Sequence, residues 1–169
     1  MKNIIFSLLL TFSIQGCTST DSSSYPISQS DIQPQIYTFL DLKGEKLELW
    51  KKARNHIATV YGDSKEVMRV EDESEGSLIG KGLVQWKMID SAISPYCYSS
   101  YDIRFLAKDG KARLQLELLS GVPAGSECVA WTLPSKYGYD QILVKFGLMA
   151  KTFETILRSE DSIGGINDF

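Results

Sequence analysis

Histidine is almost absent from the sequence. His56 is the only one among 169 residues, and a lone histidine lacks the partners that a general base or a metal site needs. No Ser-His-Asp set can be assembled without it. Because His56 flanks an apolar helical stripe, we interpret it as a half-buried packing residue. We expect no enzymatic activity, no catalytic residue, no metal ion and no cofactor.

An excess of positive charge is also lacking. The chain has 18 basic and 21 acidic residues, a net charge of −3, and no block of lysines or arginines. Such a chain is a poor candidate for binding phosphate backbones or anionic lipid headgroups. We therefore do not expect nucleic acid as a partner.

The apolar stretch at residues 4–14 is too short to span a bilayer, which takes about 20 residues. It is preceded by Lys2 and followed by Gly16. A positive start, a short apolar stretch and a small residue at the end are typical of a secretory signal. Residues 1–16 are therefore predicted to be a signal peptide.

Residues 14–17 read Ile-Gln-Gly-Cys and resemble the bacterial lipobox, in which a small residue directly precedes an obligatory cysteine. The resemblance implies lipidation of Cys17 on its sulfur and its amino group, and several acyl chains on one residue give stable anchoring. An ordinary cleavage site beside a chance cysteine is the alternative. We expect a lipid-anchored protein of the cell envelope. In a Gram-negative source the resemblance implies the outer membrane, because Thr18 lacks the acidic charge that retains some lipoproteins in the inner membrane.

The composition divides the rest of the chain into three parts. Residues 17–35 are rich in serine, threonine and proline, and such a segment buries too little surface to offset the entropy lost on ordering. After the lipidated cysteine we therefore predict a flexible tether. Residues 36–158 are sized for a single domain, and the acidic residues 159–169 are predicted to be a flexible tail.

Only two cysteines remain after Cys17, namely Cys97 and Cys128. In an exported protein such a pair is usually a disulfide. A thiol-based metal or redox site is the alternative, but it would need a nearby CxxC motif or several histidines. We predict a disulfide between the two.

A helix is predicted over residues 44–63, where apolar side chains recur at helical spacing. Its apolar stripe comprises Trp50, Ala53, Ile57, Val60 and Tyr61, and the opposite side carries Lys51, Lys52, Asn55 and Thr59. Residues 65–73 and 77–90 alternate with a period of two, as strands do. The first places Met68 and Val70 on one face, and the second contains Gly80 and Gly82, which would allow a bulge.

Residues 101–120 predict a hairpin. Asp109-Gly110 suits a type I′ turn, and closing the turn there pairs Lys108 with Lys111 and fixes the register. One face then carries only apolar pairs: Ala107 with Ala112, Phe105 with Leu114, Ile103 with Leu116, and Tyr101 with Leu118. The other face is polar, and its one apolar side chain is Leu106, opposite Arg113.

A second amphipathic helix is predicted over residues 141–158, with Asp140 as its N-cap. It must bury its apolar stripe against the apolar sheet face. The predicted fold is therefore α+β, a four-stranded antiparallel meander with two amphipathic helices packed on one face.

From about Phe39 to Leu157 the chain resembles a family of bacterial exported domains of unknown function with a predicted TBP-like fold. The first helix around Trp50, the strand "LIGKGLVQWK" and the hairpin "YDIRFLAKDGKARLQLELL" carry the resemblance. It implies a fold but no catalytic residues, and likeness to a DNA-binding saddle does not imply DNA binding.

Two further motifs are incomplete, one in its spacing and one in a required residue. Residues 76–82 have three residues where a phosphate-binding loop needs four, and residues 71–76 begin a calcium-loop pattern whose twelfth position is Gly82 instead of glutamate. Two classes of function remain. One is a non-catalytic envelope lipoprotein that binds a protein or glycan partner. The other is an inhibitor or immunity-type lipoprotein that neutralises an exported enzyme.

Overall fold

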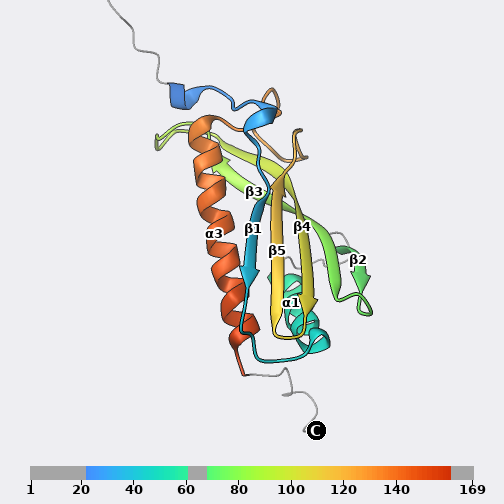
Figure 1. Ribbon diagram of the computed structural model, residues 1–169. Helices are drawn as coiled ribbons and strands as arrows, with labels where there is room; N and C mark the ends of the chain where they lie inside the picture. The colour runs from blue at the N-terminus through green and yellow to red at the C-terminus, as the bar shows by residue number, and fades with distance from the viewer. Residues whose placement is uncertain (1–21, 61–67, 161–169) are drawn as a thin grey trace, which may run out of the picture.

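The computed structural model describes residues 22–60 and 68–160, and its main feature is a five-stranded antiparallel sheet (Figure 1). The strands are β1 (Gln35–Phe39), β2 (Met68–Asp72), β3 (Ser77–Lys87), β4 (Tyr96–Lys108) and β5 (Lys111–Leu118), in the spatial order β1-β5-β4-β3-β2. The helices are α1 (Lys46–Val60) and α3 (Lys136–Arg158), and two short 3-10 helices, Ser22–Ser24 and Gln29–Asp31, precede β1.

The sheet has one strand more than the four predicted. β1 pairs antiparallel with β5, with Tyr37 opposite Leu114 and Phe39 opposite Ala112. Its sequence gives little signal because it is short and lies at the edge, and Phe39 is its only buried residue. The meander β2-β3-β4-β5 is as predicted, and β1 extends it beyond β5.

The folded domain begins before residue 36, where the sequence predicted its start. Ile27 is buried, and its N–H donates to the carbonyl of Pro134 at 2.9 Å, beside a bridge between Pro26 and Ser135. Much of the segment predicted as a tether therefore lies against the start of α3. The prediction for residues 17–21, Cys17 included, falls outside the described residues.

α1 buries Trp50, Ala53 and Ile57 as predicted, but two assignments were wrong. Val60 is exposed, because it lies in the last turn beyond the packed stripe. Lys52, assigned to the solvent side, is buried, because its Nζ donates to the carbonyl of Ser159 at 2.7 Å and pairs with Glu48 at 2.9 Å.

α3 begins four residues before the predicted N-cap. Ser135 is the actual N-cap, since its Oγ accepts a hydrogen bond from the N–H of Gly138 at 3.0 Å. Its hydroxyl also donates to the carbonyl of Met88 at 2.7 Å, which joins the helix start to the end of β3. Asp140 lies within the first turns and forms an ion pair with Lys136.

The bulge that the glycines of β3 were predicted to allow lies in β2 instead. β3 pairs continuously with β4, whereas the register of β2 shifts between Met68 and Val70. A bulge of this kind turns later side chains to the other face, so Val70 is exposed and not beside buried Met68. Gly82 allows the ring of Tyr101 to lie close to the backbone of β3, because a Cβ at Gly82 would overlap that ring.

The hairpin register is confirmed at every predicted pair, from Lys108 opposite Lys111 to Tyr101 opposite Leu118. The type I′ prediction for the turn is wrong, because a type I′ turn needs φ > 0 at both central residues. Gly110 has φ +71°, but Asp109 does not have a positive φ. The apolar pairs face α1 and α3, which lie on the same side of the sheet (Figure 1). The core there includes Trp86, Phe105 and Phe146. The opposite side has no helix over it among the described residues.

Candidate functional site

The uncovered face of the sheet is built by the alternate residues that point away from the helices. Six large apolar side chains are exposed on it: Ile36 55%, Leu40 54%, Leu83 52%, Val70 44%, Leu106 38% and Ile79 37%. Exposed apolar patches on soluble domains mark interaction sites. This face is therefore the candidate functional site.

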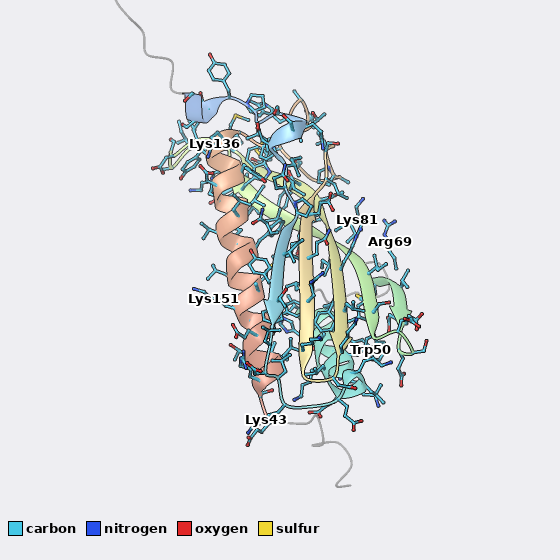
Figure 2. The ribbon with its side chains drawn as sticks, in the orientation of Figure 1. Lys43, Trp50, Arg69, Lys81, Lys136 and Lys151 are labelled. Atoms are coloured by element: carbon cyan, nitrogen blue, oxygen red, sulfur yellow. A yellow bond between two sulfur atoms is a disulfide. The ribbon has the colours of Figure 1, made fainter. Side chains whose placement is uncertain are left out.

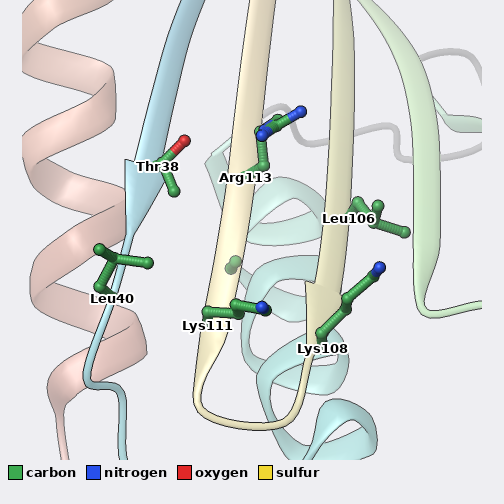
Figure 3. A pocket seen from close by; sticks show the side chains of 7 residues that line it. Thr38, Leu40, Leu106, Lys108, Lys111 and Arg113 are labelled. Atoms are coloured by element: carbon green, nitrogen blue, oxygen red, sulfur yellow. The ribbon is translucent and has the colours of Figure 1, made fainter.

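A groove hollows this face over the ends of β1, β5 and β4 (Figure 3). Its volume is about 320 Å³, near the lower limit for a ligand site. The residues that line it come from three neighbouring strands and the position after β1: Thr38, Leu40, Leu106, Lys108, Lys111, Ala112 and Arg113. Apolar and basic groups alternate around it, and no acidic residue lines it.

The three cations of the groove have no acidic partner among the described residues. Lys108 and Lys111 lie directly opposite each other across the hairpin, and Arg113 lies opposite Leu106 and Thr38. Like charges directly opposite across strands destabilise a sheet. The fold therefore keeps a local concentration of positive charge in a chain whose net charge is −3.

Acidic residues of the same face lie farther up the sheet. Asp102 and Glu117 are opposite each other, two pairs beyond Arg113 on the outward side, and Asp102 is 3.7 Å from Arg104. Glu117 is four positions from Arg113, which corresponds to about 13 Å along a strand. The positive end of the face is thus distinct from its mixed upper part.

Two other hollows are less suited to a partner. One, of about 500 Å³, lies between α1 and β2, and its lining carries charges of both signs, including the Arg54–Glu71 ion pair at 2.5 Å. The other, of about 290 Å³, lies beside Ile27 and Trp131, where the N-terminal segment packs on the loop before α3. Neither combines several aliphatic side chains with charge of a single sign.

The predicted disulfide is confirmed: Cys97 at the start of β4 is bonded to Cys128 in the loop before α3, with a Cα–Cα distance of 5.3 Å. The loop is also held by side chains. Glu127 accepts a hydrogen bond from the N–H of Tyr96 at 2.9 Å, and Ser126 accepts one from the N–H of Tyr98 at 3.1 Å. These bonds take the place of strand pairing with β5, because β5 ends before it reaches this part of β4.

His56 packs edge-on against Phe153 of α3, with ring centroids 5.0 Å apart. Burial lowers the pKa of its imidazole, which favours the neutral form. Both observations fit the packing role expected from the sequence. Within residues 22–60 and 68–160, no group of three or more histidine, cysteine, aspartate or glutamate side chains is arranged to hold a metal ion.

No helix that the structure describes is both long and apolar enough to cross a bilayer.

The sequence alone did not predict the groove. Leu40 and Thr38 were missed because β1 was missed. Leu106 gave a signal, since it is the apolar exception on the polar face of the predicted hairpin, opposite one of the cations that now line the groove.

Two solved structures share this fold. One is a DUF4468 family protein from Bacteroides ovatus, with a TM-score of 0.55, 14% sequence identity, and coverage of 82% of this chain and 93% of that chain. The other is a TBP-like protein from Parabacteroides distasonis, with a TM-score of 0.55, 12% identity, and coverage of 81% and 99%. No protein-family model and no curated protein matches the sequence. At these identities the likeness shows the fold alone, an α+β domain of TBP-like type.

Proposed function

We propose that this protein is a lipid-anchored envelope protein with a non-catalytic domain that binds a protein or glycan partner on its uncovered sheet face. One observation carries the proposal: exposed apolar side chains gather on that face, while the other face is packed against two helices. Surface of this kind stays exposed in a soluble domain chiefly where something binds. The lipobox-like residues before and at Cys17 support the anchor.

Changing Cys17 to serine is expected to release the protein from the membrane fraction, because the proposed lipid is attached through the sulfur of Cys17. The measurement is fractionation of cells combined with acyl-chain labelling. Cys97→Ala/Cys128→Ala is the matched control, since it removes cysteines from the folded domain and should keep the label. A Cys17→Ser protein that still pellets and labels would show that the anchor is elsewhere.

A photo-cross-linking amino acid at Leu106 is expected to give an adduct in intact cells, because Leu106 lies on the uncovered face. Val144 is the matched control, since it is 64% exposed on α3 but points away from the sheet. A partner on this face should be captured from Leu106 and not from Val144. The opposite result would assign binding to the helix side and refute the proposed face. If the captured partner is an exported enzyme, the inhibitor class is the correct one.

A further inference from the structure

We propose that the groove beside the Asp109-Gly110 turn binds an acidic peptide segment of a partner protein. The carboxylates of that segment would pair with Lys108, Lys111 and Arg113, and its apolar side chains would lie against Leu40 and Leu106. This inference rests on the proposed function, because it names the partner chemistry of the same face.

Charge complementarity is the first argument. Lys108 and Lys111 face each other at one cross-strand position, and Arg113 follows Lys111 on the same face. Among the described residues, the ion pairs of the protein involve other cations. An incoming carboxylate would relieve the repulsion between the lysines, and the planar guanidinium of Arg113 can hold a second one through two hydrogen bonds.

Spacing is the second argument. Residues two apart on a strand point to the same side and are about 7 Å apart, which is the separation of Lys111 from Arg113. An extended peptide has the same repeat, so alternate acidic side chains can meet the two cations. Leucines at both sides of the cations supply apolar contact. A segment that alternates acidic and apolar residues therefore matches both features of the groove.

Position along the fold is the third argument. The described chain starts at the end of the sheet where α3 begins, and the groove lies at the other end, beside the β4–β5 turn (Figure 1). An anchor before residue 22 would attach the first of these ends to the membrane and direct the groove away from it. This orientation favours a protein partner over lipid headgroups. The acidic residues Asp102 and Glu117 farther up the face would repel a long phosphate backbone.

We expect that a charge reversal can be made here without loss of the fold. Lys111→Glu places opposite charges across the hairpin, so the like-charge pair with Lys108 becomes a favourable one. The side chains of Lys111 and Arg113 are exposed and belong to no ion pair within the described chain. We expect Lys111→Glu/Arg113→Glu to melt at least as high as the original protein, which separates a loss of binding from unfolding.

The test measures fluorescence anisotropy of a labelled peptide of alternating glutamate and leucine, with the soluble domain from residue 22 onward. The unchanged domain should bind it, and the affinity should fall as salt is added. Lys111→Glu/Arg113→Glu should weaken binding at least about tenfold. Arg69→Glu/Lys151→Glu is the matched control, because it changes the net charge equally at β2 and α3, away from the groove (Figure 2), and should stay within about twofold.

Other probes decide between occupants. A peptide of alternating glutamine and leucine should bind more weakly, and phosphatidylglycerol vesicles should not be bound through Lys111 and Arg113. The proposal fails if the glutamate peptide does not bind, if charge reversal leaves its affinity unchanged, or if vesicles compete better than the peptide. Cross-linking from Leu83, on the same face but outside the groove, separates the two proposals. Adducts there without peptide binding would refute only the acidic partner, and their absence from both Leu83 and Leu106 would refute the binding face.

Discussion

Changing Gly138 to alanine is expected to lower the free energy of unfolding by about 2 kcal/mol. Alanine gains roughly 1 kcal/mol over glycine inside a helix, so helix propensity alone would predict stabilisation. A Cβ at this position, however, would overlap Cε3 of the Trp86 indole and lie 2.9 Å from its Cδ2. Overpacking of a filled core costs about 1–3 kcal/mol and occasionally more, and the indole has little freedom to move.

The indole is fixed for two reasons. Trp86 is 1% exposed, and its Nε1–H donates to the hydroxyl of Ser99 at 3.0 Å. Gly147 supplies the matched control, because it lies in the same helix and a Cβ there would meet nothing within 4 Å. Urea unfolding should show Gly147→Ala stabilised by roughly 0.5–1 kcal/mol and Gly138→Ala destabilised. Equal effects of the two changes would mean that Gly138 does not pack against Trp86.

Removal of the disulfide by Cys97→Ala/Cys128→Ala is expected to cost about 3–4 kcal/mol of stability. The two cysteines are 31 residues apart, and the chain-entropy relation gives this magnitude for a closed loop of that length. Urea unfolding with and without reductant measures it.

The control for this change is the unaltered protein in reductant, which should become as unstable as the double alanine variant. Hydrogen bonds from Tyr96 and Tyr98 to the loop do not depend on the disulfide, so hydrogen exchange at these amides should stay slow in the variant. If reductant leaves the midpoint unchanged, the disulfide adds nothing to stability. If both amides exchange freely, the disulfide alone orders the loop.

The parts of the fold that the sequence predicted correctly are those in which local rules and burial agree. The Asp109-Gly110 turn sets a register, and only that register collects Phe105, Leu114 and their neighbours on one face. A two-residue period is sensitive to a slip of one position, so the pattern identifies the pairing. The disulfide was predictable because the signal-like N-terminus led us to expect export, and the two remaining cysteines then leave few alternatives.

The parts that the sequence did not predict depend on tertiary contacts. β1 has one buried residue, and its partner strand is more than 70 positions away. Ser135 caps α3 and also bonds Met88, whereas Asp140 has a suitable side chain but lies inside the helix. Lys52 is buried because it bonds to the carbonyl of Ser159 and pairs with Glu48. Helical periodicity carries no information about such a contact with a distant residue.

The groove could be predicted only in part for the same reason. Lys108, Lys111, Arg113 and Leu106 follow from the hairpin register, so one side of it was implicit in the sequence. Its other side comes from β1, and the hollow exists only where the two meet. A net charge of −3 also conceals how the charges are distributed, because the cations gather at one end of the sheet.

The contact between Ile27 and Pro134 limits the length of the connection between the folded domain and a lipid on Cys17. With the chain already packed at Ile27 and the first 3-10 helix starting at Ser22, residues 18–21 are the span between a lipid on Cys17 and the folded body. Four residues reach at most about 14 Å. Leu106 lies ten positions after Tyr96 on β4, which corresponds to roughly 33 Å of strand before the groove begins. If the end of the sheet where α3 begins lay nearest the bilayer, the groove would lie several tens of ångströms from the membrane surface. A partner anchored in the same membrane would then have to extend at least that far to reach it.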